Sequence, residues 1–175
     1  LGAMRLAPIQ CMAWDQPITS GLPTMDYFIS SALMEPPDAD EQYSERLIPL
    51  PGLGVCFQKP VIPTMLLSGN RRDFAIREDA VVYLCCQAAY KYLPQHDDVF
   101  VQIAKQVPNA QFVFLPMNVL VARDLQKRLD RAFAAGGLDA RDHCVILQQM
   151  DRFSYWNLHL VADIFLDTIG WSGGV

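Results

Sequence analysis

Apolar strand-like runs alternate with amphipathic helical segments between residues 81 and 168, so that four strands are separated by short connections and helices. A strand, a crossover helix and a following parallel strand pack in a right-handed sense, and the helices then cover both faces of the sheet. The alternation therefore predicts an α/β fold with a Rossmann-like, doubly wound parallel sheet.

Hydrophobic periodicity and breaker residues give the expected bounds of these elements. Strands are expected at residues 81–86, 111–116, 143–148 and 163–168, and helices at 94–107, 121–135 and 152–161. Pro94 favours the start of the first helix, and Gly136-Gly137 favours the end of the second. The residues expected to face the sheet are Phe100, Ile103, Ala104 and Val107 on the first helix, and Phe153, Trp156 and Leu160 on the third.

A segment rich in proline and polar residues precedes this regular part. Residues 58–72 show no sustained period and are interpreted as a linker. Before them, strand-like pieces at 7–14, 25–30 and 46–50 occur with little helix, which does not make a self-sufficient core. We expect residues 1–57 to be a remnant of a first lobe. Residues 73–175 are expected to be the N-terminal part of a second lobe, incomplete because the chain stops where a further helix should begin.

Composition excludes several classes of protein. Of the residues, 51% are hydrophobic and 19% are charged, which favours a buried core over disorder. A formal net charge of -5 without clustered cations argues against a nucleic-acid partner. The closest cation groups, Arg71-Arg72 and Lys127-Arg128-Arg131, are too small for a polybasic membrane patch. No apolar run approaches the roughly 20 residues that span a bilayer and no signal peptide is visible, so no membrane partner is expected.

The five cysteines are odd in number, and most lie within apolar runs: Cys11, Cys56, Cys85, Cys86 and Cys144. This pattern indicates reduced, core-packed thiols in a cytoplasmic protein. Cys85 and Cys86 are neighbours in an expected strand, so their side chains point to opposite faces and they are not interpreted as a redox pair.

Ligands of an open parallel sheet bind outside the carboxyl ends of its strands, and the first candidate residues follow the first strand. Gln87 to Pro94 connect that strand to its helix. Lys91 in this connection, beside a helix N-terminus, would suit a pyrophosphate. The alternative is a solvated loop lysine.

The second candidate group follows the third strand. Arg152, Tyr155 and His159 are spaced to share one helix face. A cation and an aromatic ring there would hold a phosphate and stack a base. The alternative is an ordinary amphipathic helix.

The third candidate is Gly173-Gly174 after the fourth strand, where glycines let the backbone approach a phosphate closely. Metal chemistry is not expected. Asp38-Ala39-Asp40 matches an Asp-x-Asp metal motif but lies in a polar acidic stretch, which favours a solvated loop. The histidines, His96, His143 and His159, lack metal-ligand spacing with any cysteine pair.

Short motifs along nearly the whole chain resemble, in order, those of the protein O-GlcNAc transferase family, which includes bacterial cytoplasmic protein glucosyltransferases. In the first part, residues 5–10, 17–21 and 25–27 resemble the family's APIQ…GxPxTSG…DY stretch, and residues 42–47 with Pro51 resemble YSE(K/R)L…LP. In the second part, Tyr90-Lys91 before Pro94 resembles YKxxP, and residues 162–168 resemble ADxxLDT.

The resemblance implies a GT-B architecture of two Rossmann-like lobes, of which this chain is a partial copy. It implies inverting, metal-independent transfer of a sugar, GlcNAc or glucose, from a UDP-sugar to protein side chains. The implied partners are a UDP-sugar and a protein acceptor, with no cofactor. The family's tetratricopeptide array and acceptor histidine lie upstream of this chain. We therefore expect these 175 residues alone to be inactive, although the parent protein is an enzyme.

Carried over by position, the resemblance implies roles for single residues. Lys91 would be catalytic, binding the diphosphate with Gln87 beside it and stabilising UDP as it leaves. Arg152 matches a family lysine near the nucleotide, and Tyr155 matches a histidine that stacks on uracil. The backbone at Met150 would contact the base, and Gly173 and Gly174 would reach the phosphate-binding turn.

Two departures from the family bear on the sugar. Asp15-Gln16-Pro17 stands where the family often has Gly-His-Pro or Gly-Tyr-Pro, and Ala88 stands where it has a glutamine. One alternative is a non-catalytic, GT-B-like protein-interaction module. Another is a GT-B enzyme that builds lipid-linked or free glycans.

Overall fold

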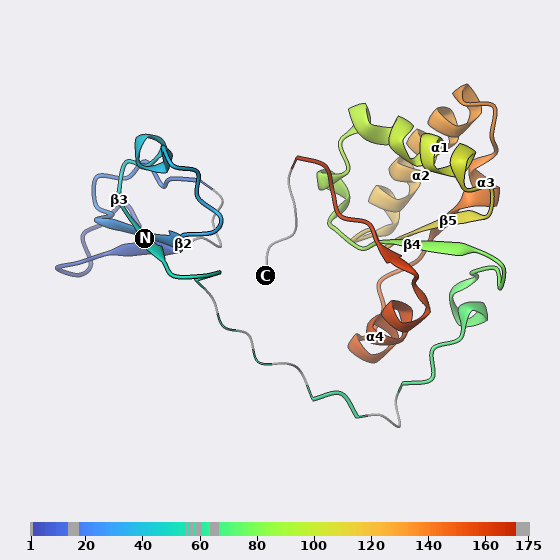
Figure 1. Ribbon diagram of the computed structural model, residues 1–175, viewed down its shortest axis with the longest axis horizontal. Coiled ribbons are helices and arrows are strands. Elements are labelled where there is room, and N and C mark those ends of the chain that lie inside the picture. Colours follow the sequence, from blue (N-terminus) through green and yellow to red (C-terminus); the bar gives the residue numbers. More distant parts are fainter. Residues whose placement is uncertain are drawn as a thin grey trace. The chain divides into compact units, whose positions relative to one another are not determined.

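The computed structural model describes residues 2–13, 18–54, 56, 58, 61–63 and 67–170. These residues form two compact units that divide between Val61 and Ile62 (Figure 1). We call the part up to Val61 unit 1 and the part from Ile62 unit 2. The division falls inside the segment 58–72 that the sequence predicts to be a linker.

Unit 1 is a small parallel sheet. Its elements are β1 (Cys11–Ala13), β2 (Tyr27–Ser31), the 3-10 helix η1 (Ala39–Gln42) and β3 (Arg46–Leu50). The strands lie in the order β1-β2-β3, and both pairs are parallel. A buried cluster of Phe28, Ala39 and Leu47 holds η1 against the sheet. Asp38 and Asp40 are exposed as predicted, but Asp40 lies in η1 and not in a loop.

β1 is shorter than the strand expected at residues 7–14. The chain before it turns around the Gln10 side chain, whose Oε1 accepts from the Leu6 N–H at 2.8 Å. The amide nitrogen of Gln10 donates to the Thr24 carbonyl at 2.7 Å. These side-chain hydrogen bonds replace the ladder that a longer strand would need.

A buried carboxylate fixes the loop between β1 and β2. Glu45, only 5% exposed, precedes β3 and accepts from the Ser20 N–H at 2.8 Å. The hydroxyls of Ser20 and Thr19 also donate to it. Burial alone would raise the pKa of Glu45, but these hydrogen bonds lower it to about 2.

Unit 2 is the predicted doubly wound domain. Its strands are β4 (Val81–Cys85), β5 (Ala110–Phe114), β6 (Cys144–Ile146) and β7 (Ile164–Phe165). They are all parallel and lie in the order β6-β5-β4-β7, with the first strand of the unit inside the sheet. Its helices are η3 (Arg71–Phe74), η4 (Ala89–Lys91), η5 (Pro94–His96), α1 (Asp97–Gln106), α2 (Val119–Ala135), α3 (Ala140–His143) and α4 (Arg152–Val161).

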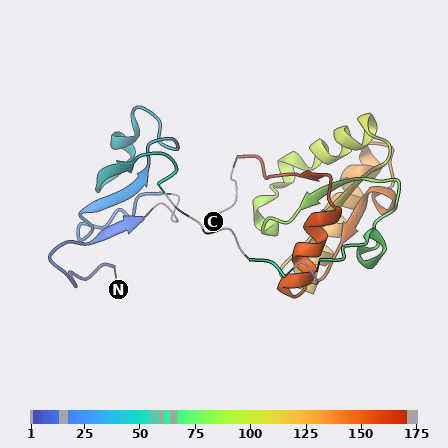
Figure 2. The ribbon, with the colours of Figure 1, turned by 60° about the horizontal axis from the view of Figure 1, so that its bottom comes forward.

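Helices cover both faces of this sheet, as Figures 1 and 2 show. On one face Tyr83, Cys85 and Phe112 pack against α1 and α2. On the other face, Val82 and Leu84 pack against Leu158 and Val161 of α4. The side chains of β4 thus alternate between two buried layers, which is why its sequence is apolar at every position.

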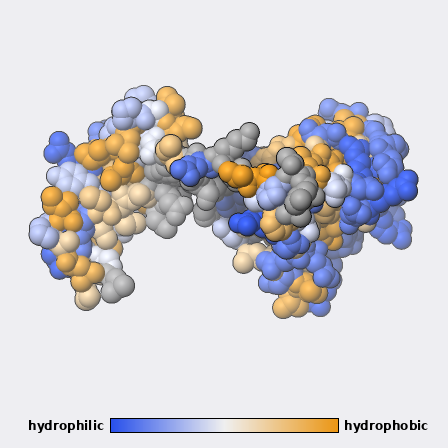
Figure 3. Space-filling view, turned by 90° about the horizontal axis from the view of Figure 1, so that it is seen from below, coloured by the Kyte–Doolittle hydropathy of each residue, from blue (hydrophilic) through white to orange (hydrophobic). Residues whose placement is uncertain are grey.

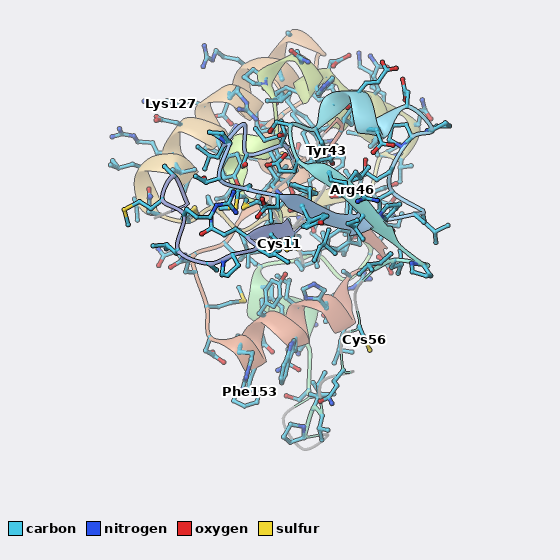
Figure 4. The ribbon with its side chains drawn as sticks, turned by 90° about the vertical axis from the view of Figure 1, so that its left-hand side faces the viewer. Cys11, Tyr43, Arg46, Cys56, Lys127 and Phe153 are labelled. Carbon is cyan, nitrogen blue, oxygen red and sulfur yellow. The ribbon has the colours of Figure 1, made fainter. Side chains whose placement is uncertain are left out.

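The predicted core face of α4 is wrong. Phe153 and Trp156 are only partly buried and Leu160 is 58% exposed, whereas Leu158 is fully buried. Figure 4 shows Phe153 projecting from α4 on the side away from the sheet. Leu158 and Val161 fit a helical period as well as the predicted residues do, and they form the face of α4 that packs against the sheet.

The first helix also differs in detail from its prediction. Its first turn is the separate 3-10 helix η5, and α1 begins at Asp97. Phe100 and Ala104 are buried as predicted, but Val101 is buried in place of Ile103 and Val107, which are only partly buried. The short helix α3 before β6 was not predicted from periodicity, because four residues are too few to show one.

The cysteines divide into two kinds. Cys85 and Cys144 are buried as predicted, whereas Cys11 and Cys56 are exposed, so the core-packed prediction is wrong for these two. Cys86 is half-buried on the opposite side of β4 from Cys85, as strand alternation predicts.

Apolar residues also reach the surface of each unit (Figure 3). No helix in the described part of the chain is long and apolar enough to cross a bilayer.

Candidate functional site

The described candidate residues gather at the carboxyl edge of the unit 2 sheet. Gln87 and Lys91 follow β4, Met150 follows β6, and Asp167 follows β7. Because the strands are parallel, these connections leave the sheet at the same edge. The other predicted candidates, Gly173 and Gly174, lie outside the described residues.

Lys91 is buried at this edge. It ends η4 and is 8% exposed, so it is not the solvated loop lysine that the sequence left open. Its Nζ lies 3.5 Å from Oε1 of Gln87. A small cavity of about 40 Å³ beside it is also lined by His96, Phe100 and Thr168. A buried ammonium group beside a cavity presents a fixed positive charge, so this position suits an anionic ligand.

A chain of polar contacts leads from Lys91 to the end of β7. The amide nitrogen of Gln87 donates to Oδ1 of Asp167 at 3.1 Å. The same carboxylate oxygen accepts from the Thr168 N–H at 2.8 Å. The Gln87 N–H donates in turn to the Tyr92 hydroxyl at 3.0 Å. Gln87, which follows β4, therefore links the loop that carries Lys91 to the end of β7.

An ion pair between α2 and α1 supports the loop that carries Lys91. Arg128 of α2 lies with its Nε 2.7 Å from Oδ2 of Asp97, the first residue of α1. Its Nη2 donates to the Tyr92 carbonyl at 2.6 Å. The Tyr92 ring packs edge-on against Phe114, with centroids 5.5 Å apart. Of the predicted cation group on α2, Arg128 is thus turned inward, whereas Lys127 extends outward (Figure 4).

α4 starts beside this edge at a strong cap. The Asp151 carboxylate accepts from the N–H groups of Phe153 at 2.8 Å and Ser154 at 3.2 Å. These bonds satisfy amides of the first turn and leave Arg152 exposed at the helix start. The Arg152 guanidinium lies 5.1 Å from the Trp156 ring centroid. It therefore contacts the Phe153 and Trp156 side of α4 rather than Tyr155, the neighbour expected from helical spacing.

Tyr155 and His159 do share a face. Their ring centroids lie 4.4 Å apart, edge to face. Cys86, directly after β4, joins them: the Tyr155 hydroxyl lies 3.3 Å from its sulfur, and His159 Nε2 lies 4.0 Å from it. Sequence reasoning missed this contact, because it linked α4 to Lys91 and not to the last residue of the first strand run. The signal was present in the position of Cys86 at a carboxyl strand end.

The contact between these three side chains shifts the pKa of each of them. Burial acts to raise the pKa of the Cys86 thiol, but hydrogen bonds with His159 and Tyr155 outweigh it, and the pKa lies below its usual value. The contact with Cys86 raises the pKa of His159. Burial, with the hydrogen bond to Cys86, raises the pKa of Tyr155 to about 12.

Met150 is half-buried in the loop before α4 and packs against the buried cluster that contains Leu158 and Val161.

Comparisons with known proteins agree in both sequence and structure. Residues 1–53 match the model for Glycosyl transferase family 41. The predicted resemblance to the protein O-GlcNAc transferase family is confirmed. The matched stretch contains the family-like motifs at residues 5–10 and 42–47.

Two curated plant relatives of this family match nearly the whole chain. The probable UDP-N-acetylglucosamine–peptide N-acetylglucosaminyltransferase SPINDLY of Arabidopsis thaliana is 27% identical over 98% of the chain, and the chain covers 18% of that protein. SEC of the same plant, which carries the same enzyme name, is 26% identical over 95% of the chain and is covered to 17%. The chain therefore spans less than a fifth of the length of these relatives.

A solved family structure confirms the fold. A mutant of the Thermobaculum terrenum O-GlcNAc transferase superposes with a TM-score of 0.72 at 22% sequence identity. The superposition covers 95% of this chain and 30% of the other. The predicted α/β architecture, a partial GT-B fold with parallel sheets, is thus found. Asp15-Gln16-Pro17, the first departure from the family motifs, lies outside the described residues.

Proposed function

We propose that this chain is part of an inverting, metal-independent glycosyltransferase that moves GlcNAc or glucose from a UDP-sugar to protein side chains. The chain's part in that reaction is to bind the donor through unit 2. The enzyme names of the plant relatives support the donor and acceptor classes. The observation that carries the proposal is the buried amine of Lys91 at the carboxyl edge of a doubly wound sheet.

The proposed role of Lys91 follows from charge. Cleavage of the bond between sugar and phosphate leaves an additional negative charge on UDP. A fixed ammonium group in a water-poor site stabilises that charge as it develops, which is the service a divalent metal provides in other enzymes. Gln87 would hold the amine in place, because its Oε1 lies 3.5 Å from Nζ. In this proposal Lys91 is catalytic, and Gln87 belongs to the donor site.

The start of α4 would receive the nucleoside. Tyr155 offers a half-buried ring that is fixed by Cys86 and His159, and such a ring can stack on a planar base. Arg152 is exposed at the helix start, on the Phe153 and Trp156 side of α4, and its proposed role is to supply positive charge to the phosphates. The backbone at Met150, in the loop before the helix, would read the base edge. Gly173 and Gly174 complete the proposed donor site.

The acceptor and the compartment are also part of the proposal. The acceptor is a protein side chain, and the parent protein is proposed to carry a tetratricopeptide array. Free thiols at Cys85 and Cys144 fit a reducing compartment, so the proposed location is the cytoplasm. Ala88, at the position of a family glutamine near the lysine, bears on the choice between GlcNAc and glucose.

Calorimetric titration of the full-length parent protein tests the donor role. UDP, UDP-GlcNAc and UDP-glucose are titrated into wild type, Lys91→Met and Lys127→Met. Loss of a charged hydrogen bond of about 1.5–3 kcal/mol predicts that Lys91→Met weakens UDP binding by about 10- to 100-fold. Lys127→Met, which removes an exposed amine from α2, should bind as wild type.

Three outcomes would contradict the proposal. Equal UDP affinity in wild type and Lys91→Met removes the proposed role of the lysine. UDP-sugar binding without transfer to any protein acceptor favours the non-catalytic interaction module. Transfer to a lipid or a free glycan would instead identify a GT-B enzyme that builds lipid-linked or free glycans.

A further inference from the structure

Cys86, Tyr155 and His159 form a cluster of which the proposed reaction uses only the Tyr155 ring. Cys86 lies at the carboxyl end of β4, and the other two lie one turn apart on α4. The Cys86 sulfur lies 3.3 Å from the Tyr155 hydroxyl and 4.0 Å from His159 Nε2. We call these three residues the thiol cluster. Two elements from distant parts of the sequence therefore meet at one sulfur atom.

The hydrogen-bond pattern fixes which histidine nitrogen faces the thiol as a base. His159 Nδ1 lies 2.8 Å from the carbonyl oxygen of Tyr155. A carbonyl oxygen can only accept, so Nδ1 carries a proton. In the neutral ring, Nε2 then holds the lone pair, and this is the atom that faces Cys86. The arrangement of thiol, imidazole base and a third group that orients the base is the one that activates a cysteine nucleophile.

The Tyr155 hydroxyl acts on the same sulfur as a donor. A phenol whose pKa is raised to about 12 stays protonated at neutral pH and can donate to a thiolate. The thiol pKa of Cys86 is lowered and the pKa of His159 is raised, which is the direction that favours a thiolate–imidazolium pair. Two further titratable groups lie near the thiol: Cys85, behind it on the strand, and Tyr92, and burial raises the pKa of both.

The reactivity of a cysteine depends on access to its sulfur and on neighbouring groups that favour its thiolate, and Cys86 combines the two. Burial raises the pKa of Cys85 well above its usual value and that of Cys144 to about 12, so both are inert thiols. Cys11 and Cys56 are exposed and belong to unit 1, so neither is a member of the thiol cluster of unit 2. Cys86 is half-buried and has a base and a donor on its sulfur.

We propose that Cys86 is a nucleophilic modification site that takes soft carbon electrophiles of the α,β-unsaturated carbonyl class. His159 Nε2 accepts the thiol proton, and the sulfur forms a bond to the β-carbon as the carbon–carbon π bond breaks. The electron pair of that π bond moves to the α-carbon, which then takes the proton from His159. Every atom of the electrophile is retained in the adduct, and no oxidant is needed.

The adduct has a consequence for the donor site. It would sit against the Tyr155 ring, which is the proposed platform for the nucleotide base. Modification would therefore displace UDP, and bound UDP would shield the thiol. This consequence rests on the proposed function, whereas the reactivity of Cys86 does not.

The test measures site-resolved alkylation of the full-length protein. N-ethylmaleimide, an α,β-unsaturated carbonyl probe, is added briefly at pH 6 to 8, and each cysteine peptide is quantified by mass spectrometry. Cys86 should react faster than Cys11 and Cys56 at pH 6, because His159 and Tyr155 favour its thiolate. His159→Gln should slow the reaction of Cys86 at pH 6 by about tenfold, because loss of the base raises the pKa of the thiol and lowers its thiolate fraction. Tyr155→Phe should slow it to a lesser degree.

The controls separate chemistry from folding and from donor binding. Circular dichroism and the thermal midpoint show whether each variant is folded, and Cys11 should react equally in all of them. An equal rate for Cys86 and Cys11 at pH 6, or an unchanged rate in His159→Gln, would overturn the thiol site. If Cys86 reacts fast but 1 mM UDP gives no protection (a concentration of about 10³ times a micromolar Kd), the thiol site stands and the placement of the base on Tyr155 fails.

Discussion

The side-chain amide of Gln87 donates a hydrogen bond to Oδ1 of Asp167 across 3.1 Å. Gln87 follows β4 and Asp167 follows β7, so the bond joins the ends of two neighbouring parallel strands. The oxygen of the same amide lies 3.5 Å from Nζ of Lys91. The carboxylate thereby orients the amide, and the amide presents its oxygen to the lysine.

Asp167→Ala should weaken UDP binding although the residue is not proposed to touch UDP. Without the carboxylate, the Gln87 amide can turn and Lys91 loses its fixed partner. One hydrogen bond of about 1 kcal/mol predicts a roughly fivefold rise in Kd by calorimetry. The matched control is Asp124→Ala, which removes an exposed carboxylate from α2. An unchanged Kd in Asp167→Ala would show that the amide does not position the lysine.

Asp97 should titrate above the usual value for an aspartate. Burial raises its pKa more than the charge of Arg128 lowers it, and its Oδ1 has no hydrogen-bond partner among the described residues. The folded state then binds more protons than the unfolded state above pH ~4, so ionisation of Asp97 reduces the free energy of unfolding as the pH rises. Carbon-detected NMR of the carboxyl group measures this pKa.

The Arg128→Met variant provides a second test of the raised pKa of Asp97. Loss of the cation should move the Asp97 pKa further upward, because the partner that favours the charged form is gone. In urea unfolding, the difference in stability between wild type and Arg128→Met should grow as the pH rises above ~4. A pKa of Asp97 that falls in the variant would contradict this account.

Glu45 should make unit 1 sensitive to acid. Its pKa of about 2 in the folded state lies below the unfolded value, so its stabilisation is complete above pH ~4.3 and is lost as the pH falls toward 2. The full effect is no more than about 3 kcal/mol, from a shift of about two units. Glu45→Gln should lose this part of the pH dependence when unfolding is followed by a probe in unit 1. Glu41→Gln, an exposed neighbour, should retain it.

Gly69→Ala should destabilise unit 2, although the residue lies in the segment predicted to be a linker. A Cβ on Gly69 would lie 2.7 Å from the backbone oxygen of Asn157 in α4, which cannot move aside easily. Overpacking of this kind costs about 1–3 kcal/mol and should lower the thermal midpoint. Ser68→Ala keeps the backbone N–H that donates to Asn157 Oδ1 at 3.0 Å and should melt as wild type. Equal midpoints for both variants would mean that this segment does not dock on α4.

The alternation of strand-like and helical runs in the sequence is sufficient to predict the fold of unit 2. Strand-like runs with short, right-handed crossovers allow few parallel arrangements, and the observed order β6-β5-β4-β7 is one of them. The bounds of β3 and α4 also match their predictions, since local breakers and caps such as Asp151 set them. Lys91 could be placed at the carboxyl edge for the same reason, because its position follows from chain order alone.

Only the tertiary structure decided how side chains meet. Periodicity allows two apolar faces on α4, and the sheet's buried layer selected Leu158 over Phe153. The burial of Lys91 depends on Gln87 and on residues that follow β7, far along the chain. The thiol cluster joins Cys86 to a helix about seventy residues later, a contact that no local pattern encodes. Sequence fixes which elements form because those forces are local, whereas packing between elements depends on complementary shape and charge that appear only once they touch.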